Sequence, residues 1–303
     1  MGDDAPSQDL PPGTRIGEYV LDERVARGGM STIYAASHPV LGKRAAIKIL
    51  DLTQSAIATE RLVREARTVN LIRHPNVVEV FGFGQLADGR HYMAMDLLLG
   101  ESLARRLGRF RLAHGEAYEI LIQVADVLDA AHVLGVAHLD LKPDNIFLVP
   151  VNGGSTLVKV LDFGLASQVD LAQQPPPQAL GFFRGTPDYA SPEQAQGLAS
   201  VDLRSDIYSL GVVAYQMIVG RRPFVGATVV ETLLKQIGEP PPRPTNLCNT
   251  VTPEAEQLLL DMLHKAPERR PRASEVRERL LSFRNTILKA STQTMPGVDM
   301  QKR

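Results

Sequence analysis

The spacing of hydrophobic positions along the chain changes near Gly100. Before this residue, apolar and polar side chains alternate in short runs that are rich in β-branched residues, and turn residues separate the runs. Alternation with a period of two predicts strands that bury one face. Five runs are predicted as antiparallel strands: Tyr19–Arg24, Thr32–Ser37, Ala45–Leu50, Val77–Phe83 and Tyr92–Leu97.

After Gly100 the hydrophobic positions recur with the 3.6-residue period of an amphipathic helix. A helix of the same kind, Ala58–Ile72, interrupts the strands and places Leu62, Ala66 and Val69 on one face. The helices predicted after Gly100 are Glu116–Leu134, Asp206–Val219, Thr228–Ile237, Pro253–Leu263 and Ala273–Leu288.

These patterns predict an α+β fold with two lobes. Residues 14–98 would form a small antiparallel β-rich lobe with one main helix, and residues 99–290 a larger, mainly helical lobe. Residues 1–13 and 291–303 are rich in small and polar side chains, which is typical of disordered ends.

The composition makes several classes of protein improbable. The single cysteine, Cys248, provides neither an intramolecular disulfide nor a multi-cysteine zinc site, and it fits a cytoplasmic location. The formal net charge of -1 gives no reason to expect a nucleic-acid partner. The longest uncharged apolar stretch, Ile207–Gly220, would span about 21 Å as a helix. A bilayer core is roughly 30 Å thick, so we expect no membrane segment in this chain.

A loop of small residues between two predicted strands is the first candidate for chemistry. The small residues are Ala26, Gly28, Gly29 and Ser31, and they would let backbone N–H groups approach phosphates. Taken alone, the loop is explained equally well by a glycine-rich hairpin.

Lys48 lies in an otherwise apolar strand, where its charge needs an anionic partner or ligand. Glu65 on the following helix is the candidate partner. Glu60 is an alternative, but it lies about 140° around the helix from Glu65, so both cannot face Lys48. A lysine on the solvent face of the strand is the simpler alternative.

A third group of polar residues follows a predicted helix and a short strand. Asp140 and Asn145 lie five residues apart in a proline-containing loop, and Asp162 follows a later short strand. A carboxylate can accept a proton from a hydroxyl group, and an amide oxygen with a second carboxylate can bind Mg²⁺. Loop capping is the alternative explanation for each acidic residue alone.

Together, these motifs occur in the order glycine loop, strand lysine, helix glutamate, Asp–Lys–Asn loop and Asp-Phe-Gly. The chain therefore resembles the eukaryotic-like protein kinase family, in its bacterial Ser/Thr type, over about residues 18–285. Gly185–Glu193 resembles the end of a kinase activation segment, and Asp206–Gly211 resembles the central buried helix. Arg270-Pro271 resembles the arginine that pairs with the glutamate of that segment.

The resemblance implies transfer of the ATP γ-phosphate to serine or threonine hydroxyls of proteins, with Mg²⁺ as the cofactor and Mn²⁺ as a possible substitute. Asp140 would accept the hydroxyl proton, and Lys142 would neutralise the γ-phosphate. Asn145 and Asp162 would hold Mg²⁺, while Lys48, fixed by Glu65, would contact the other two phosphates. Lys142 together with Thr186 suggests serine or threonine acceptors.

By the same resemblance, backbone amides of residues 26–31 would cover the phosphates and apolar side chains would enclose adenine. The adenine-binding residues would be Ile33 and Ala46 above the ring, Phe147 below it, Met95 behind it, and the backbone from Asp96 to Leu98 along its edge.

The sequence departs from the family pattern at Ala26 and Ser31, which replace glycines, and at Leu139, which stands where most regulated kinases have arginine. That arginine normally binds an activation-loop phosphate. Residues 166–184 also offer only Ser167 as a hydroxyl group. We therefore expect activity without activation-loop phosphorylation. The apolar residues Leu180, Phe182 and Phe183 would dock the loop or face a partner.

Other functions remain as alternatives. A pseudokinase scaffold would bind nucleotide without turnover, but all five charged or amide residues of the motif are present. Small-molecule phosphotransferases lack the Gly185–Glu193 segment, and a non-enzymatic interaction module would not need the motif. The expected partners are protein substrates, with self-association possible for autophosphorylation. His138 is expected to be a packed histidine rather than a metal ligand.

Overall fold

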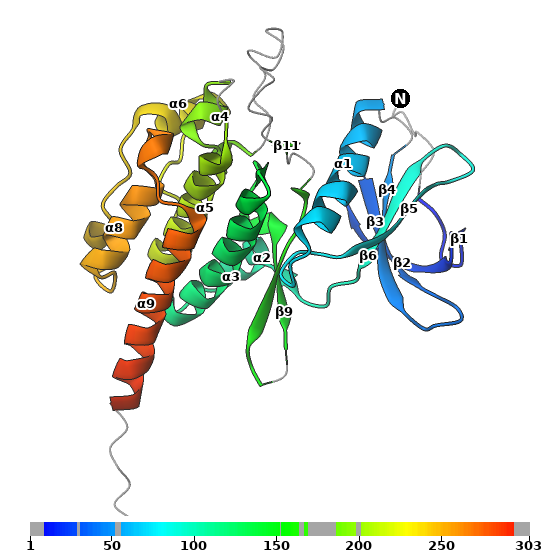
Figure 1. Ribbon diagram of the computed structural model, residues 1–303, viewed down its shortest axis with the longest axis horizontal. Helices are drawn as coiled ribbons and strands as arrows, with labels where there is room; N and C mark the ends of the chain where they lie inside the picture. Colours follow the sequence, from blue (N-terminus) through cyan, green and yellow to red (C-terminus); the bar gives the residue numbers. More distant parts are fainter. Residues whose placement is uncertain are drawn as a thin grey trace, which may run out of the picture. The chain divides into compact units, whose positions relative to one another are not determined.

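The computed structural model describes residues 9–28, 31–51, 56–151, 153–163, 167–168, 186–197 and 201–293. The chain divides into two compact units, of which the first comprises residues 1–101 and 147–166 and the second comprises residues 102–146 and 167–303. The first unit contains an antiparallel sheet with one main helix, and the second is mainly helical (Figure 1). This is the α+β architecture that the periodicity predicts.

Six strands of the first unit form one sheet in the order β1-β2-β3-β4-β6-β5, and every pair is antiparallel. The strands are β1 Arg15–Ile16, β2 Tyr19–Arg27, β3 Ser31–Ser37, β4 Arg44–Leu50, β5 Val80–Gln85 and β6 His91–Asp96. The predicted strand at Val77–Phe83 instead begins at Val80, because Val77 pairs with Val160 in a separate parallel bridge.

The two faces of the sheet have different roles. Ala45, Ile47 and Ile49 of β4 contribute to a buried hydrophobic cluster with Leu21. Because successive side chains in a strand point to opposite faces, Ala46 and Lys48 lie on the other face. The alternation that predicted the strand therefore also separates the core from the candidate site.

The first unit extends beyond the predicted lobe boundary at residue 98. Residues 147–166 include β10 (Thr156–Val160) and all but the first residue of β9 (Ile146–Pro150), and they group with the sheet rather than with the helices. The side-chain amide of Asn76 donates a hydrogen bond of 2.7 Å to the Val158 carbonyl. Contacts of this kind, between distant parts of the sequence, attach the hairpin to the first unit.

Residues 9–13, which the sequence places in a disordered tail, pack on the sheet. The Leu10 side chain packs against the hydrophobic cluster, and its backbone N–H donates to the Tyr34 hydroxyl at 2.9 Å. The Gly13 N–H donates to the Leu21 carbonyl at 2.8 Å. One leucine in a polar segment gives no periodic signal, so the pattern did not indicate this contact.

The main helix of the first unit, α1, spans Ala56–Ile72. Leu62, Ala66 and Val69 are buried, as the predicted apolar face requires. Glu65 is buried among them, with 6% of its surface exposed. A carboxylate at such a position needs a partner.

In the second unit, helix α5 (Leu203–Val219) is buried along nearly its whole length. It packs against α3 (His114–Val133) and α8 (Pro253–Met262), and α3 also lies along α9 (Ala273–Gln293) (Figure 1). The remaining elements are α2 Leu103–Leu107, α4 Pro192–Ala195, α6 Val229–Gly238, α7 Pro244–Leu247, β7 Glu101–Ser102, β8 Val136–Ala137 and β11 Ser167–Gln168. Helices of four or five residues are too short to show a hydrophobic period, so α2, α4 and α7 were not predicted.

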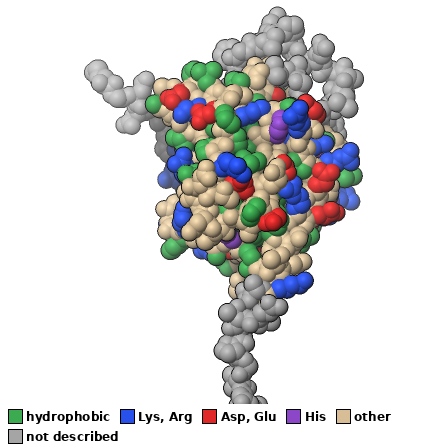
Figure 2. Space-filling view, turned by 90° about the vertical axis from the view of Figure 1, so that its left-hand side faces the viewer, with side chains coloured by type: hydrophobic (Ala, Val, Ile, Leu, Met, Phe, Trp, Pro, Cys, Tyr) green, Lys and Arg blue, Asp and Glu red, His purple; other side chains and the backbone are tan. Residues whose placement is uncertain are grey.

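Charged side chains of both signs are interspersed on the face drawn in Figure 2, and no field of one sign covers that face. The formal net charge of -1 fits this mixture. Within the described ranges, no helix combines the length and apolar character needed to cross a membrane.

Candidate active site

In the first unit, the candidate residues Lys48, Glu65 and Asp162 meet in one cluster. Lys48 Nζ lies 3.1 and 3.2 Å from the two carboxylate oxygens of Glu65 and 2.7 Å from Asp162 Oδ1. The expected ion pair between Lys48 and Glu65 is therefore present. Glu60 belongs to α1, but its side chain lies outside the described residues.

Burial and charge act against each other in this cluster. Burial alone would lower the pKa of Lys48, but the carboxylates of Glu65 and Asp162 raise it, so the lysine stays charged. Burial raises the pKa of Glu65 to about 7, opposed by Lys48. One cation is thus shared by two carboxylates. The Asp162 side chain is 51% exposed, so a ligand can reach its carboxylate from solvent.

The residues expected around adenine lie on the same sheet face as Lys48. Ile33 pairs with Lys48 across β3 and β4, and Met95 pairs with Ala46 across β4 and β6. Directly paired residues share a face of the sheet, so register alone groups these side chains.

The other expected nucleotide-binding positions are also in the first unit. Phe147 lies at the start of β9 and is half-buried, as are Asp96 and Leu98. The Asp96 N–H is already engaged, because it donates to the Glu79 carbonyl at 3.0 Å.

The small-residue loop joins β2 and β3. Ala26 pairs with Ile33 at the end of β2, and the Gly28 N–H donates to the Ser31 carbonyl at 2.8 Å, which closes the turn. Gly29 lies outside the described residues.

In the second unit, Asp140 lies at the centre of a polar cluster. Lys142 Nζ donates to Asp140 Oδ2 at 2.7 Å and to Thr186 Oγ1 at 2.9 Å. The Thr186 hydroxyl also lies 3.3 Å from Asp140 Oδ1. The Asp140 carboxylate, the Lys142 cation and Thr186, near the start of the Gly185–Glu193 segment, are therefore in direct contact.

Asn145 completes this cluster from the short 3₁₀ turn Pro143–Asn145. Its side-chain nitrogen donates to the Asp140 carbonyl at 2.9 Å. The contact uses the amide nitrogen, so the amide oxygen is the atom suited to a cation. An amide oxygen belongs to the hard oxygen ligands that Mg²⁺ prefers.

Asp206 holds the backbone that precedes Asp140. Its buried carboxylate accepts hydrogen bonds of 2.8 Å from the N–H groups of both His138 and Leu139, and it lies 2.9 Å from His132 Nε2. The sequence indicated only a family resemblance for Asp206. A single acidic residue at the start of an apolar helix nevertheless indicates a structural role, because a buried carboxylate needs several hydrogen-bond donors.

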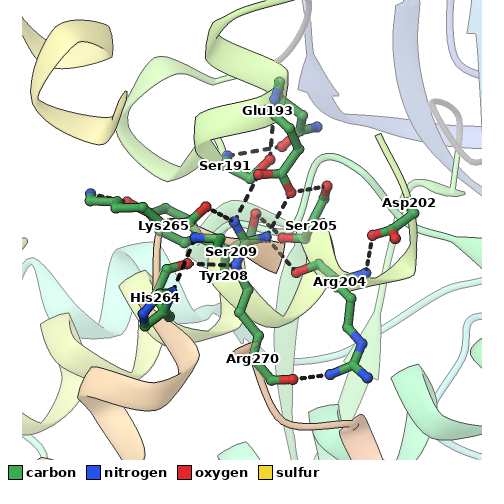
Figure 3. A network of polar contacts seen from close by, with 12 residues as sticks. Ser191, Glu193, Asp202, Arg204, Ser205, Tyr208, Ser209, His264, Lys265 and Arg270 are labelled. Atoms are coloured by element: carbon green, nitrogen blue, oxygen red, sulfur yellow. Dashed lines mark hydrogen bonds and ion pairs between the residues drawn. The ribbon is translucent and has the colours of Figure 1, made fainter. Parts of the chain in front are cut away.

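The expected pair between Arg270 and Glu193 is present in the second unit. Arg270 Nη1 lies 2.6 Å from Glu193 Oε1, and Arg270 Nη2 lies 2.8 Å from Oε2. Figure 3 shows these contacts. The arginine side chain is completely buried. Ser205 Oγ donates to the same carboxylate at 2.6 Å, so the segment that ends at Glu193 is anchored to α5.

A second anchor of this segment comes from α6. The side-chain amide of Gln236 donates to the Asp188 carbonyl at 2.8 Å, and its oxygen accepts from the Tyr208 hydroxyl at 2.7 Å. Lys265 Nζ donates to the Tyr208 hydroxyl at 3.0 Å and to the Gln236 carbonyl at 2.8 Å. No motif marked Gln236, because its partners lie 28 and 48 residues away in the sequence.

Lys265 should make stability depend on pH. Burial, helped by the positive charge of Arg270, lowers the pKa of Lys265 to about 7. An unfolded lysine titrates near 10.4, so between these values the unfolded chain binds more protons and the free energy of unfolding rises with pH. Urea unfolding at pH 7.5 and 9 should show the wild type gaining up to about 2 kcal/mol relative to Lys265→Met.

The exposed Lys289 supplies the control for this measurement. Lys289→Met should retain the pH dependence of the wild type. Equal pH dependence in the wild type and in Lys265→Met would contradict the prediction.

The fold and the two clusters define a class of protein: an α+β chain of two units with a buried lysine–glutamate pair in the first unit and an Asp–Lys–Asn loop in the second. Comparison with known families gives the family itself. Residues 19–281 match the protein kinase domain. The chain therefore belongs to the protein kinase domain family.

Curated relatives come from bacteria, as the motifs predicted. The chain is 41% identical over 283 residues to serine/threonine-protein kinase Pkn1 of Myxococcus xanthus, covering 93% of this chain and 39% of the relative. It is 37% identical over 264 residues to pkn3 of the same organism, covering 85% and 48%. It is 37% identical over 269 residues to PknA of Mycobacterium tuberculosis, covering 86% and 59%. The chain thus spans about two to three fifths of the length of these relatives.

Proposed function

We propose that this chain is an ATP-dependent protein kinase that phosphorylates serine and threonine hydroxyls. The observation that carries the proposal is the contact of Asp140 with both Lys142 and Thr186. In this contact Asp140, the proposed proton acceptor, lies beside a cation at the segment proposed to receive a peptide. The names of the bacterial relatives support serine and threonine as acceptors.

In the proposed reaction, the substrate hydroxyl oxygen forms a bond to the γ-phosphorus while the bond between that phosphorus and the β–γ bridging oxygen breaks. Asp140 accepts the hydroxyl proton, and ADP leaves with the bonding electrons. Lys142 stabilises charge on the transferred group. The Lys48 ammonium, held by Glu65, binds the phosphates that remain on ADP.

Mg²⁺, when bound, would neutralise phosphate charge and orient the γ-phosphate for transfer. Asn145 and Asp162 are the residues proposed to hold it. Ile33, Ala46, Met95 and Phe147 are proposed to enclose adenine. The apolar sheet face that carries the first three supports that assignment.

The alternative is a pseudokinase that binds nucleotide without turnover. Such a protein would not need a carboxylate and a lysine held together at the peptide-binding segment. The Asp140–Lys142 contact at 2.7 Å therefore favours the enzyme.

Transfer of labelled phosphate from Mg·ATP to a generic basic protein, followed by phosphoamino-acid analysis, tests the proposal. We expect label on serine or threonine and a requirement for a divalent cation, which Mn²⁺ also meets. Label on neither residue, with nucleotide still raising the melting temperature, would favour the pseudokinase.

We also propose that activity does not require phosphate on the activation loop. Leu139 carries no charge to bind such a phosphate, and its backbone is held by other groups. The residues expected to dock the loop, Leu180, Phe182 and Phe183, lie outside the described residues.

Ser167→Ala should therefore retain wild-type kcat within about twofold, and mass spectrometry of active wild type should find residues 166–184 unmodified. Dephosphorylated wild type is the control, and it should be equally active. Loss of activity on removing phosphate from this loop would contradict the proposal.

The partners proposed are protein substrates, and a second copy of the chain is one candidate substrate. Because the proposed reaction consumes ATP, we propose that the protein acts in the cytoplasm. Phosphate transfer between a tagged inactive variant and an untagged wild type would test the self-directed reaction. Label on the wild type alone would exclude transfer between copies.

A further inference from the structure

Leu139, directly before Asp140, has a backbone conformation that residues other than glycine rarely adopt. Its φ is 64°, in the left-handed region. The only other described residues with positive φ besides glycines are Arg73 and Asp162. This region is unfavourable for a residue with a Cβ atom, so the surrounding structure must hold it in place.

Both backbone polar groups of Leu139 are held by side chains. Asp206 Oδ1 accepts from the Leu139 N–H at 2.8 Å. Gln194 Nε2 donates to the Leu139 carbonyl at 2.8 Å. Gln194 belongs to α4, 55 residues away in the sequence.

The carbonyl of Leu139 belongs to the same peptide plane as the N–H of Asp140. That N–H lies 3.3 Å from His138 Nδ1. Gln194 and His138 therefore hold the plane at its two ends. Because the plane is rigid, its orientation sets the direction in which Asp140 leaves the backbone. A rotated plane would move the Asp140 carboxylate away from Lys142 and Thr186.

The Gln194 amide is itself oriented by a capping box at the start of α4. Its Oε1 accepts from the Ser191 N–H at 3.0 Å, and its backbone N–H donates to Ser191 Oγ at 3.3 Å. With the amide oxygen facing Ser191, the amide nitrogen faces Leu139. The backbone N–H of Ser191, and not its hydroxyl, thus orients the side-chain donor that holds the strained backbone.

We propose that Gln194 is a positioning residue for Asp140: it holds the strained Leu139 peptide and so keeps the carboxylate aimed at the substrate hydroxyl. The inference deepens the proposed kinase function and rests on it. Leu139 itself offers no polar side chain for this purpose. The link also couples the peptide-binding segment to the proton acceptor, since Gln194 directly follows the last residue of that segment, Glu193.

Gln194→Glu separates the two contacts of this side chain. A glutamate at this place keeps the capping box, because a carboxylate oxygen can accept from the Ser191 N–H. It cannot donate to the Leu139 carbonyl. We expect kcat to fall roughly tenfold to a hundredfold, as for a misplaced catalytic group, with KM for ATP within about twofold of wild type.

Ser191→Ala is the matched control, because it removes one bond of the capping box and keeps the Gln194 donor. Its kcat should stay within about threefold of wild type. An equal loss of kcat in Ser191→Ala and Gln194→Glu would show that activity depends on the helix cap and not on the bond to the Leu139 carbonyl. Wild-type kcat in Gln194→Glu would also overturn the proposal.

Rescue supplies a test that a purely structural role would not pass. Glycine adopts positive φ without a steric penalty, so Leu139→Gly relieves the strain that Gln194 holds. The double variant Leu139→Gly/Gln194→Glu should recover most of the kcat lost by Gln194→Glu. No recovery would overturn the proposal.

Hydrogen exchange separates this inference from the proposed function. Gln194→Glu should raise the exchange rate of peptides covering residues 138–142, and Ser191→Ala should not. If wild type transfers no phosphate but exchange changes in this way, the kinase proposal fails and the backbone contact stands. If wild type is active and exchange does not change, the positioning role fails alone.

Discussion

Replacement of Asp140 by asparagine should lower kcat for phosphate transfer by about 10²- to 10⁴-fold, the usual contribution of a general base. Asparagine has nearly the same shape and can still accept from Lys142, but its amide cannot take up the hydroxyl proton. The free energy of unfolding and KM for ATP should change little. Steady-state phosphate transfer and urea unfolding measure the two effects.

Asp144→Asn provides the control in the same loop. Asp144 is exposed and lies within the same 3₁₀ turn as Asn145. Its substitution should leave kcat within about threefold of wild type. An Asp140→Asn variant that retained a tenth of wild-type kcat would show that Asp140 is not the proton acceptor.

Arg270→Met should destabilise the fold by about 3–5 kcal/mol, because it leaves the buried Glu193 carboxylate without its partner. The arginine also donates to the carbonyls of Arg204, His264 and Lys265, and these acceptors would lose their donor. Urea unfolding measures the loss, and the melting temperature should fall with it.

A second arginine–glutamate contact of equal length provides the control. Arg243 Nη2 lies 2.6 Å from Glu256 Oε1, but the arginine side chain is 68% exposed. Glu256 is buried, but without Arg243 its carboxylate would keep the hydrogen bonds from the backbone N–H and the hydroxyl of Thr245. Because the arginine of this pair is screened by solvent, Arg243→Met should cost far less than Arg270→Met. Similar losses in the two variants would contradict the importance of burial.

The pH dependence of the Arg270→Met defect has a definite sign. Burial alone would raise the pKa of Glu193, but hydrogen bonds and charge from Arg270 hold it below its usual range in the wild type. The wild type therefore gains stability above pH 4–5 and loses it as pH falls through the lowered pKa. In Arg270→Met, burial instead penalises the carboxylate above pH 4–5. The difference between the two proteins should be larger at pH 7 than at pH 4.5.

A double variant separates the unpaired charge from the lost packing. Glu193→Gln/Arg270→Met has no buried carboxylate left without a cation, so it should be more stable than Arg270→Met at pH 7. If adding Glu193→Gln to Arg270→Met restored no stability, the loss in Arg270→Met would come from the other contacts of the arginine.

Periodicity and local capping explain the part of the fold that the sequence predicted. The strand at Ala45–Leu50 and the helix at Pro253–Leu263 appear within a residue of their predicted ends. The Thr252 side chain accepts from the Ala255 N–H at 3.3 Å, and Pro253 follows it at the first helical position. Such signals involve residues only a few positions apart, so one sequence shows them.

The site could be predicted to the extent that it consists of motifs. The resemblance to kinases identified Lys48, Glu65, Asp140 and Asn145, and it paired Lys48 with Glu65 and Arg270 with Glu193. The Lys48–Glu65 and Arg270–Glu193 contacts are present. The catalytic and nucleotide-binding roles of these residues stay predictions, which the variants above address.

Strand alternation, helix periodicity and charged residues in apolar surroundings follow from the amino-acid order, because each depends on near neighbours. The contacts that hold the site could not be obtained in this way. Gln194 meets Leu139 across 55 residues, Gln236 meets Asp188 across 48, and Asp206 meets Leu139 across 67. A hydrogen bond to a backbone carbonyl or N–H does not depend on which amino acid carries that group, so the sequence does not indicate the partner. Only the packing of α4 and α5 within the second unit decided which polar side chains hold the Leu139 peptide beside Asp140.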